Sequence, residues 1–405
     1  MTTKNSRKLL ALTLATLALS QTPALAGSDN FAETLQLGSS NAAAIVQNGS
    51  GNTVGYRPVA AALGLLQNGD RNSANITQTG NDNTVSQYRE YSNVTVSELQ
   101  KGNDNTADIT QTGNGNAVGE FIYAYNPGLQ QQGNFNAATV LQEGNDNQVT
   151  GLIQVGNANT GSVTQVGSLN GAYLSQNGES NTGVINQTGD RNSADSTVAY
   201  GSVGSLTTIT QAGDLNRASQ ALTGTLNIAS ISQNGDSNYA YQWMPSPNRG
   251  EGNLVSINQD GNFNRATQSP VAGNFNTLST DQTGNLNNSV ISAAGNGNIA
   301  NVEQNGSSNN ADISILGDSN LLVAIAQAGS GNDGDIAING SSNIATITQT
   351  TDGNKGTITT AGNFNSAIIG QGGGIGNIAS ISQAGNLNVA SISQIGTGNT
   401  SSIQQ

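Results

Sequence analysis

One six-residue motif, Gln-x-Gly-x-x-Asn, constrains this chain more than any other feature, because it recurs 20 times without a mismatch in 405 residues. The copies begin at Gln36, Gln47, Gln67, Gln78, Gln100, Gln111, Gln131, Gln142, Gln154, Gln165, Gln176, Gln187, Gln211, Gln233, Gln259, Gln282, Gln304, Gln327, Gln383 and Gln394. Most spacings are 11 residues or close to 22, which neither chance nor biased composition produces. The repeat therefore predicts a stack of equivalent units in which each unit contacts only its neighbours.

The full unit has 11 residues and is clearest from Gln383 to Ser393, where Asn388, Ala390 and Ile392 lead to the next Gln394 at every second position. A period of two is typical of a β-strand with these residues on one face and small polar residues on the other. The glycine within the motif supplies the backbone freedom of a tight arc. Each unit is therefore predicted to be one strand and one arc.

In the C-terminal half the glutamine position alternates between glutamine and a mostly apolar residue, so two units are predicted to form one coil of 22 residues. The predicted fold class is all-β, an amyloid-like β-solenoid of strand-arc-strand coils with two facing parallel sheets. Residues 36–405 would hold about 33 units in about 17 coils, a rod of roughly 80 Å. The degenerate segments Gly55–Leu66, Tyr88–Leu99, Gly119–Gln130, Asp195–Thr210 and Tyr241–Asn258 are interpreted as bulged rungs of nearly constant length.

Buried asparagine and glutamine are costly unless their amides are paired, and stacking offers each amide an identical partner one rung above and below. The sequence therefore predicts structural ladders along the rod. Their residues are Gln36, Gly38, Asn41, Gln47, Gly49, Asn52, Gln67, Gly69, Asn72, Gln78, Gly80, Asn83, Gln100, Gly102, Asn105, Gln111, Gly113, Asn116, Gln165, Gly167, Asn170, Gln176, Gly178, Asn181, Gln282, Gly284, Asn287, Gln304, Gly306, Asn309, Gln383, Gly385, Asn388, Gln394, Gly396 and Asn399. A disordered polar linker is the competing interpretation, and the alternation with Ala, Ile, Leu and Val opposes it.

The N-terminus is interpreted as an export signal, because Lys4, Arg7 and Lys8 precede an apolar run and Ala24-Leu25-Ala26 follows it. Cleavage after Ala26 would leave a short mature segment, residues 27–35, before the repeats. A transmembrane anchor is the alternative, but the apolar run of about 11 residues is shorter than the ~20 that a span needs.

The composition argues against most chemistry, since the chain has no Cys and no His and only 9% charged residues. The common general base, metal ligand and thiolate nucleophile are therefore missing, and we expect no catalytic residue, metal or cofactor, and no enzyme of the β-helix type. The Gly-Asn-Asp-Asn arcs suggest calcium only weakly, since most arcs carry no acid. A net charge of −13 and 12 basic residues give no evident nucleic-acid surface.

Charged residues lie mainly in the predicted arcs, where they face water without interrupting a strand. We interpret them as gatekeepers that slow premature association without preventing stacking. The residues are Asp70, Arg71, Asp190, Arg191, Asp214, Asp236 and Asp318.

The repeat resembles that of the curlin family, bacterial amyloid subunits with the pattern Ser-x5-Gln-x-Gly-x2-Asn-x-Ala-x3-Gln, as in Ser380 to Gln394 and Gln67 to Gln78. Its rhythm is closest to that of the minor, nucleating subunit, although this chain has over three times the usual number of repeats. The resemblance implies a secreted, homopolymeric extracellular fibre of the biofilm matrix that supports adhesion and cell aggregation, with other curlin subunits and an outer-membrane export channel as partners. Repeats that continue to Gln405 predict open strand edges and templated growth. A solitary, surface-held β-solenoid adhesin that binds glycans or host surfaces is the alternative.

Overall fold

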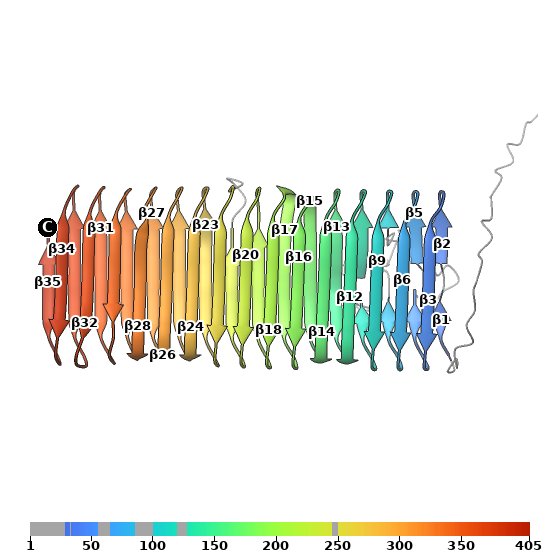
Figure 1. The fold of residues 1–405 in the computed structure, drawn as a ribbon, viewed down its shortest axis with the longest axis horizontal. Helices are drawn as coiled ribbons and strands as arrows, with labels where there is room; N and C mark the ends of the chain where they lie inside the picture. The colour runs from blue at the N-terminus through green and yellow to red at the C-terminus, as the bar shows by residue number, and fades with distance from the viewer. Residues whose placement is uncertain (1–28, 33, 56–64, 86–99, 120–127, 245–249) are drawn as a thin grey trace, which may run out of the picture.

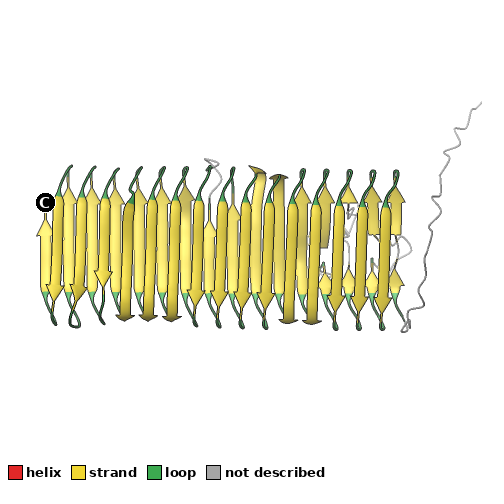
Figure 2. Ribbon diagram, viewed as in Figure 1, coloured by secondary structure: helices red, strands yellow, loops and turns green. Residues whose placement is uncertain are grey.

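The protein is a straight rod of stacked β-strands (Figure 1). The computed structural model describes residues 29–32, 34–55, 65–85, 100–119, 128–244 and 250–405. Every regular element in this part of the chain is a strand, and it contains no helix (Figure 2). The strands form two parallel sheets, which confirms the predicted all-β solenoid with two facing parallel sheets. The predicted signal segment, residues 1–26, lies outside the described residues.

The two sheets alternate along the chain, so that one strand of each makes a coil. The 15-stranded sheet contains β3 (Ala42–Asn48), β6 (Ser73–Thr79), β9 (Thr106–Thr112), β12 (Ala137–Asn145), β14 (Thr160–Ser168), β16 (Thr182–Thr188), β18 (Leu206–Ala212), β20 (Ile228–Asn234), β22 (Leu254–Asp260), β24 (Thr277–Asn285), β26 (Ile299–Ser307), β28 (Leu322–Ser330), β30 (Ile344–Gln349), β32 (Ser366–Gly372) and β34 (Val389–Ile395).

The 20-stranded sheet faces it across the interior. It contains β1 (Phe31–Ala32), β2 (Thr34–Leu37), β4 (Thr53–Val54), β5 (Leu65–Asn68), β7 (Thr84–Val85), β8 (Gln100–Lys101), β10 (Ala117–Val118), β11 (Gly128–Gln132), β13 (Gln148–Val155), β15 (Gly171–Glu179), β17 (Ser193–Val203), β19 (Arg217–Leu222), β21 (Tyr239–Trp243), β23 (Arg265–Ala272), β25 (Asn288–Ala294), β27 (Asn310–Leu316), β29 (Asp333–Asn339), β31 (Lys355–Ala361), β33 (Ile378–Ala384) and β35 (Thr400–Gln404).

The described rod has fifteen turns instead of the predicted seventeen, because three early coils are longer than expected. Gln36 pairs with Gln67, Gln67 with Gln100, and Gln100 with Gln131, at separations of 31, 33 and 31 residues. The prediction that the coils containing Gly55–Leu66, Tyr88–Leu99 and Gly119–Gln130 keep a nearly constant length is therefore wrong, and residues 56–64, 86–99 and 120–127 of these segments lie outside the described residues. In each of these coils one rung of the 20-stranded sheet is split into two short strands, as in β4 and β5, and the extra residues fall between them. With a rise of about 4.8 Å per strand, fifteen turns give a rod of roughly 70 Å.

Two later degenerate segments do keep the rungs in register. The coil from Gln187 to Gln211 has 24 residues, and the coil from Gln233 to Gln259 has 26. A register shift in β23 between Gln268 and Val271 absorbs one irregularity. A small change in coil length is therefore accommodated within a strand or an arc without loss of parallel pairing.

The interior is narrow and is filled by columns of alanine and isoleucine that run the length of the rod. In β22 the burial alternates strictly, so Val255, Ile257 and Gln259 face inward and their neighbours face outward. The apolar columns form two buried clusters, one toward each end of the rod. Since aromatic residues make up only 4% of the chain, this small-residue packing takes the place of a bulky core.

Candidate functional site

The most regular polar feature is a glutamine ladder inside the 15-stranded sheet. Fourteen side-chain hydrogen bonds of 2.8–2.9 Å link its fifteen glutamines, each Nε2 donating to the Oε1 of the next rung. A second N–H of the same amides donates across the interior to the other sheet, as from Gln259 to the carbonyl oxygen of Tyr239 at 3.1 Å. The ladder therefore joins successive rungs and also holds the two sheets together.

A second set of ladders runs along both edges of the rod, where the motif asparagine ends each arc and precedes the next strand. The backbone N–H of Asn83 donates to Oδ1 of Asn52, and Nδ2 of Asn83 donates to the carbonyl oxygen of Gly113 at 2.8 Å. The same two contacts recur at Asn147, which is also completely buried. A short amide reaches both the previous and the next arc, which explains why this position is asparagine.

The motif glycine is required by backbone geometry. Gly284 has φ +104°, and a Cβ built there would lie 2.0 Å from the carbonyl oxygen of Gly306 on the next rung. Gly261 is in the same position relative to Gly284. Any other residue would meet both an unfavourable φ and a backbone clash, so the arcs stack closely only with glycine here.

The glutamines of the 20-stranded sheet do not form one continuous ladder. A first section runs from Gln36 through Gln67, Gln100, Gln131 and Gln154 to Gln176. Val198 follows in register, and a second section then runs through Gln220, Gln242 and Gln268, displaced by two residues along the strand. A third section joins Gln383 to Gln405.

Each displaced or restarted section leaves buried polar atoms without a partner among the described residues. These atoms are Oε1 of Gln220, Oε1 of Gln383, and the hydroxyl oxygens of Ser196, Thr207 and Thr360. The second section was missed in the sequence because its glutamines lack the glycine two residues later. The 22-residue separation between Gln220 and Gln242 was the signal in the sequence from which this section could have been predicted.

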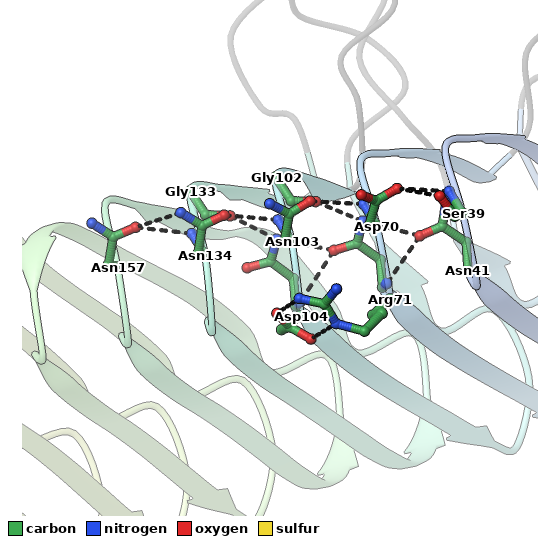
Figure 3. Close-up of polar contacts among 12 residues, drawn as sticks. Ser39, Asn41, Asp70, Arg71, Gly102, Asn103, Asp104, Gly133, Asn134 and Asn157 are labelled. Carbon is green, nitrogen blue, oxygen red and sulfur yellow. Dashed lines mark hydrogen bonds and ion pairs between the residues drawn. The ribbon is translucent and has the colours of Figure 1, made fainter.

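A third ladder runs through the exposed arcs (Figure 3). The backbone N–H of Ser39 donates to Oδ1 of Asp70 at 2.7 Å, and the N–H of Asp70 donates to Oδ1 of Asn103 at 2.8 Å. The series continues from Asn103 to Asn134 and from Asn134 to Asn157. The residue after the motif glycine therefore accepts a backbone hydrogen bond from the arc before it.

The arc carboxylates proposed as gatekeepers are not buried and take part in such ladders at both edges of the rod. Asp70 and Asp318 lie in arcs that follow the 20-stranded sheet, and an equivalent ladder on the opposite edge contains Asp190, Asp214 and Asp236. Oδ1 of Asp190 accepts from Ser168, Asp214 from Asp190, and Asp236 from Asp214, each at 2.8 Å. Asp318 accepts from Asn296 at 2.7 Å. These acids therefore have a structural role in the arcs, and their effect on association stays a prediction.

Arg71 and Asp104 form an exposed ion pair one rung apart, with Arg71 Nη2 2.6 Å from Asp104 Oδ2 (Figure 3). The hydrogen bond from Arg71 lowers the pKa of the Asp104 carboxyl, and the same bond raises the pKa of Arg71. The pKa of Asp70 is lowered first by the backbone N–H of Ser39 and then by its hydroxyl. Arg191 occupies the same left-handed arc position, at φ +58°.

In the outermost rungs each ladder glutamine has a glutamine neighbour on one side only. No described residue donates to Oε1 of Gln47 or of Gln36 in the first rungs. At the other end, among the described residues, Nε2 of Gln394 donates only to the carbonyl oxygen of Ile378, and Nε2 of Gln405 only to that of Val389. One end therefore presents amide acceptors and the other presents amide donors.

The described residues contain no cluster of three or more His, Cys, Asp or Glu side chains suited to hold a metal ion. They also contain no helix long and apolar enough to cross a membrane.

The fold and its amide ladders define the molecule as a parallel β-solenoid stabilised by stacked polar side chains. The curlin associated repeat matches the chain at residues 27–55, 63–86, 156–189, 273–306 and 374–405. The chain therefore carries curlin associated repeats at five places along its length, and the resemblance read from its motifs is confirmed. A comparison with curated proteins found no match.

Proposed function

We propose that this chain is a secreted structural subunit that self-assembles into curli-type amyloid fibres of the extracellular matrix, supporting adhesion and cell aggregation. Its partners are further copies of itself and other curlin subunits, reached after export through the signal segment at residues 1–26 and an outer-membrane channel. Its role is structural instead of catalytic.

The single observation that supports this proposal is the complementarity of the two end rungs. Every side-chain hydrogen bond in the 15-stranded ladder runs in the same direction, from Nε2 of one glutamine to Oε1 of the next. The Nε2 donor of Gln394 and the Oε1 acceptor of Gln47, both free of a glutamine partner among the described residues, could therefore form the same hydrogen bond between two copies of the chain. Unpaired strand edges favour pairing with another chain, and identical stacked side chains add to that pairing. The fibre then grows when the first rung of one copy pairs with the last rung of another.

Both end rungs also carry the full interior pattern of the repeat. Ala390, Ile392 and Gln394 face inward in β34, and Ala43, Ile45 and Gln47 occupy the corresponding positions of β3. Adding a rung would cover the partly buried Ile45 and Ile403, which now pack on one side only. The gain combines apolar burial with backbone pairing.

The test uses residues 27–405 diluted from denaturant, with thioflavin fluorescence over time and fibre diffraction of the product. A lag that preformed fibres abolish, together with ~4.7 Å and ~10 Å reflections, is the expected result. A chain that stays monomeric and β-rich at high concentration would contradict it and favour the solitary adhesin.

A matched pair of variants locates growth at the end rung. Ile403→Lys places an inward charge that an added rung would bury without a partner, so we expect elongation to fall at least tenfold. Ser402→Lys lies next to it on β35 and faces outward, so elongation should stay near that of the unmodified chain. Equal rates for the two variants would place growth elsewhere.

A further inference from the structure

One corner of the rod carries an exposed apolar ridge that neither the fold nor end-to-end growth uses. It lies where the arcs that follow the 20-stranded sheet join the outer face of the 15-stranded sheet. Its residues are between 36% and 75% exposed. We define the apolar ridge as Leu206, Leu226, Ile228, Leu254, Phe275, Ile299, Leu321, Leu322, Ile344, Phe364, Leu387 and Val389.

The ridge is continuous over nine successive rungs, from β18 to β34. Backbone pairing places Leu206, Ile228 and Leu254 directly above one another at the starts of their strands. Ile299 and Leu322 begin the corresponding later strands, and Ile344 pairs with Leu322. At about 4.8 Å per rung the ridge is roughly 38 Å long.

Most rungs contribute one bulky apolar side chain, either from the arc or from the strand. We call the left-handed residue of the arc the arc position, and the first residue of the following strand, two residues later, the strand position. In one rung the arc position is Gly252 and the strand position is Leu254. Where the arc position is Phe275, the strand position is the small Thr277, and the Phe275 ring lies over Gly252 of the previous rung, 2.7 Å from where a Cβ would be. The alternation keeps the ridge filled and even.

Folding does not explain these side chains. Phe275, Phe364 and Leu226 have φ between +54° and +58°, a left-handed conformation that suits glycine or asparagine and disfavours bulky residues. Their side chains are more than half exposed, so they gain little from burial within this chain. Single residues of this kind also occur at Phe263 and Leu286 outside the ridge, so it is the continuous row of exposed apolar side chains that points to a contact outside the chain.

The repeat does not produce the ridge either. In the N-terminal half the same arc and strand positions hold mainly small or charged residues, such as Arg71, Asp104 and Thr106, and the bulky Phe135 stands alone there. The diagonally opposite corner carries Arg217 and Lys355 at the corresponding strand position. The ridge is thus confined to one corner and to one half of the rod.

We propose that the apolar ridge is a lateral interface at which two copies of this chain lie side by side, ridge against ridge. Twelve large side chains at this exposure present on the order of 1,000 Å², which exceeds the ~800 Å² per partner of a specific protein interface. A second rod has the same rise per rung, so its side chains match the ridge along the whole length. No ridge residue is charged, whereas the chain as a whole carries −13 and repels its copies elsewhere.

This contact is separate from growth at the end rungs, so it goes beyond the proposed function and does not depend on it. Strand addition lengthens one rod, whereas the ridge pairs two rods. The acids Glu251 and Asp318 lie in the arcs beside the ridge, so pairing should strengthen with added salt.

The test replaces three ridge arc residues by asparagine, in the triple variant Leu226→Asn, Phe275→Asn and Phe364→Asn. Asparagine tolerates the left-handed arc conformation, so the fold should be kept. The matched control is Phe135→Asn, Phe263→Asn and Leu286→Asn. These three residues have the same φ range and exposure, but they lie outside the ridge.

The readout is mass per length of the assembled filaments, measured by scanning transmission electron microscopy. The unmodified chain and the control should give twice the value of a single rod, and the ridge variant should give the single-rod value. Paired filaments from the ridge variant, or single rods from the unmodified chain, would overturn the proposal.

If no filaments form, the proposed function fails while the ridge remains testable in solution. Sedimentation velocity of the folded chain then decides the outcome. A dimer of the unmodified chain and the control that dissociates at least tenfold more readily in the ridge variant would support the interface. A monomer in all three would overturn it.

Discussion

The two sheets of the rod share one repeat but differ in how strictly they keep it. The 15-stranded sheet has a glutamine at the same position in all fifteen strands, joined by an unbroken ladder. The 20-stranded sheet interrupts its ladder at Val198, displaces it at Gln220, and replaces it by Ile315, Ile338 and Thr360 further on. All three long insertions also enter this sheet, between β4 and β5, β7 and β8, and β10 and β11.

The difference shows that one continuous ladder is enough to keep the coils in register. A buried amide is costly only when its partner is missing, so the cost is concentrated where a ladder begins or ends. Because each Nε2 donates toward the C-terminal rung, the first glutamine of a section keeps an unpaired Oε1. Gln220 and Gln383 both show this, and each begins a section.

The largest expected effect comes from breaking the continuous ladder with a residue of similar shape. Gln259→Met leaves an N–H of Gln233 without its acceptor and Oε1 of Gln282 without its donor, both buried. At ~1–3 kcal/mol for each unpaired group, we expect a loss of about 3 kcal/mol. Hydrogen exchange of the β22 amides measures it, since stacked repeats open locally.

The matched variant is Gln383→Met in the 20-stranded sheet. It removes an Oε1 that is already unpaired, and the only ladder bond lost is the one donated to Oε1 of Gln405 at the exposed end. Both variants also lose one hydrogen bond across the interior, to the carbonyl oxygen of Ser366 from Gln383 and to that of Tyr239 from Gln259. The expected loss is about 1 kcal/mol or less. Equal losses for Gln259→Met and Gln383→Met would show that ladder continuity does not decide the stability of a rung.

A smaller effect of opposite sign is expected where the 20-stranded sheet holds an unpaired hydroxyl. Thr360→Val keeps the shape and removes a buried oxygen with no partner among the described residues, so we expect a gain of about 1 kcal/mol. Thr280→Val, in the other sheet, removes an oxygen that accepts from Gln268 and Ser289 and should give no gain. Denaturant midpoints of the two variants measure the difference. Stabilisation by both would mean that hydroxyl pairing is irrelevant here.

The sequence was sufficient for the regular sheet and insufficient for the irregular one, for a physical reason. Period-two alternation and the motif glycine fix which residues form strands and arcs, so the strands of β22 and β34 were predictable. Which glutamine lies above which depends on pairing between coils, so the displacement of Gln220 and the 31-residue coil from Gln36 to Gln67 were not. The left-handed arc position of Phe275 was equally hidden, since bulky residues rarely adopt it.

The smallest expected effect concerns two acids on the outer face of the 20-stranded sheet. Asp312 and Asp335 lie on adjacent rungs, and partial burial, reinforced by the charge of Asp333, raises the pKa of both carboxyls above 3.8. The folded rod therefore binds more protons than the unfolded chain as pH falls through these raised values. The resulting gain in stability is complete below about pH 3.8 and lost at neutral pH.

The double variant Asp312→Asn and Asp335→Asn isolates this effect, because it removes both titrating groups and keeps the size of the side chains. The unmodified chain should be less stable than the variant at pH 7, and the difference should shrink at pH 4, as followed by denaturant midpoints at low salt. In the 15-stranded sheet the matching position is held by Asn301 and Ala324. The acids that do pair on adjacent rungs of that sheet, Asp281 and Glu303, are the same in both chains and cancel in the comparison. A difference between the two chains that stays constant from pH 7 to pH 4 would contradict the assignment.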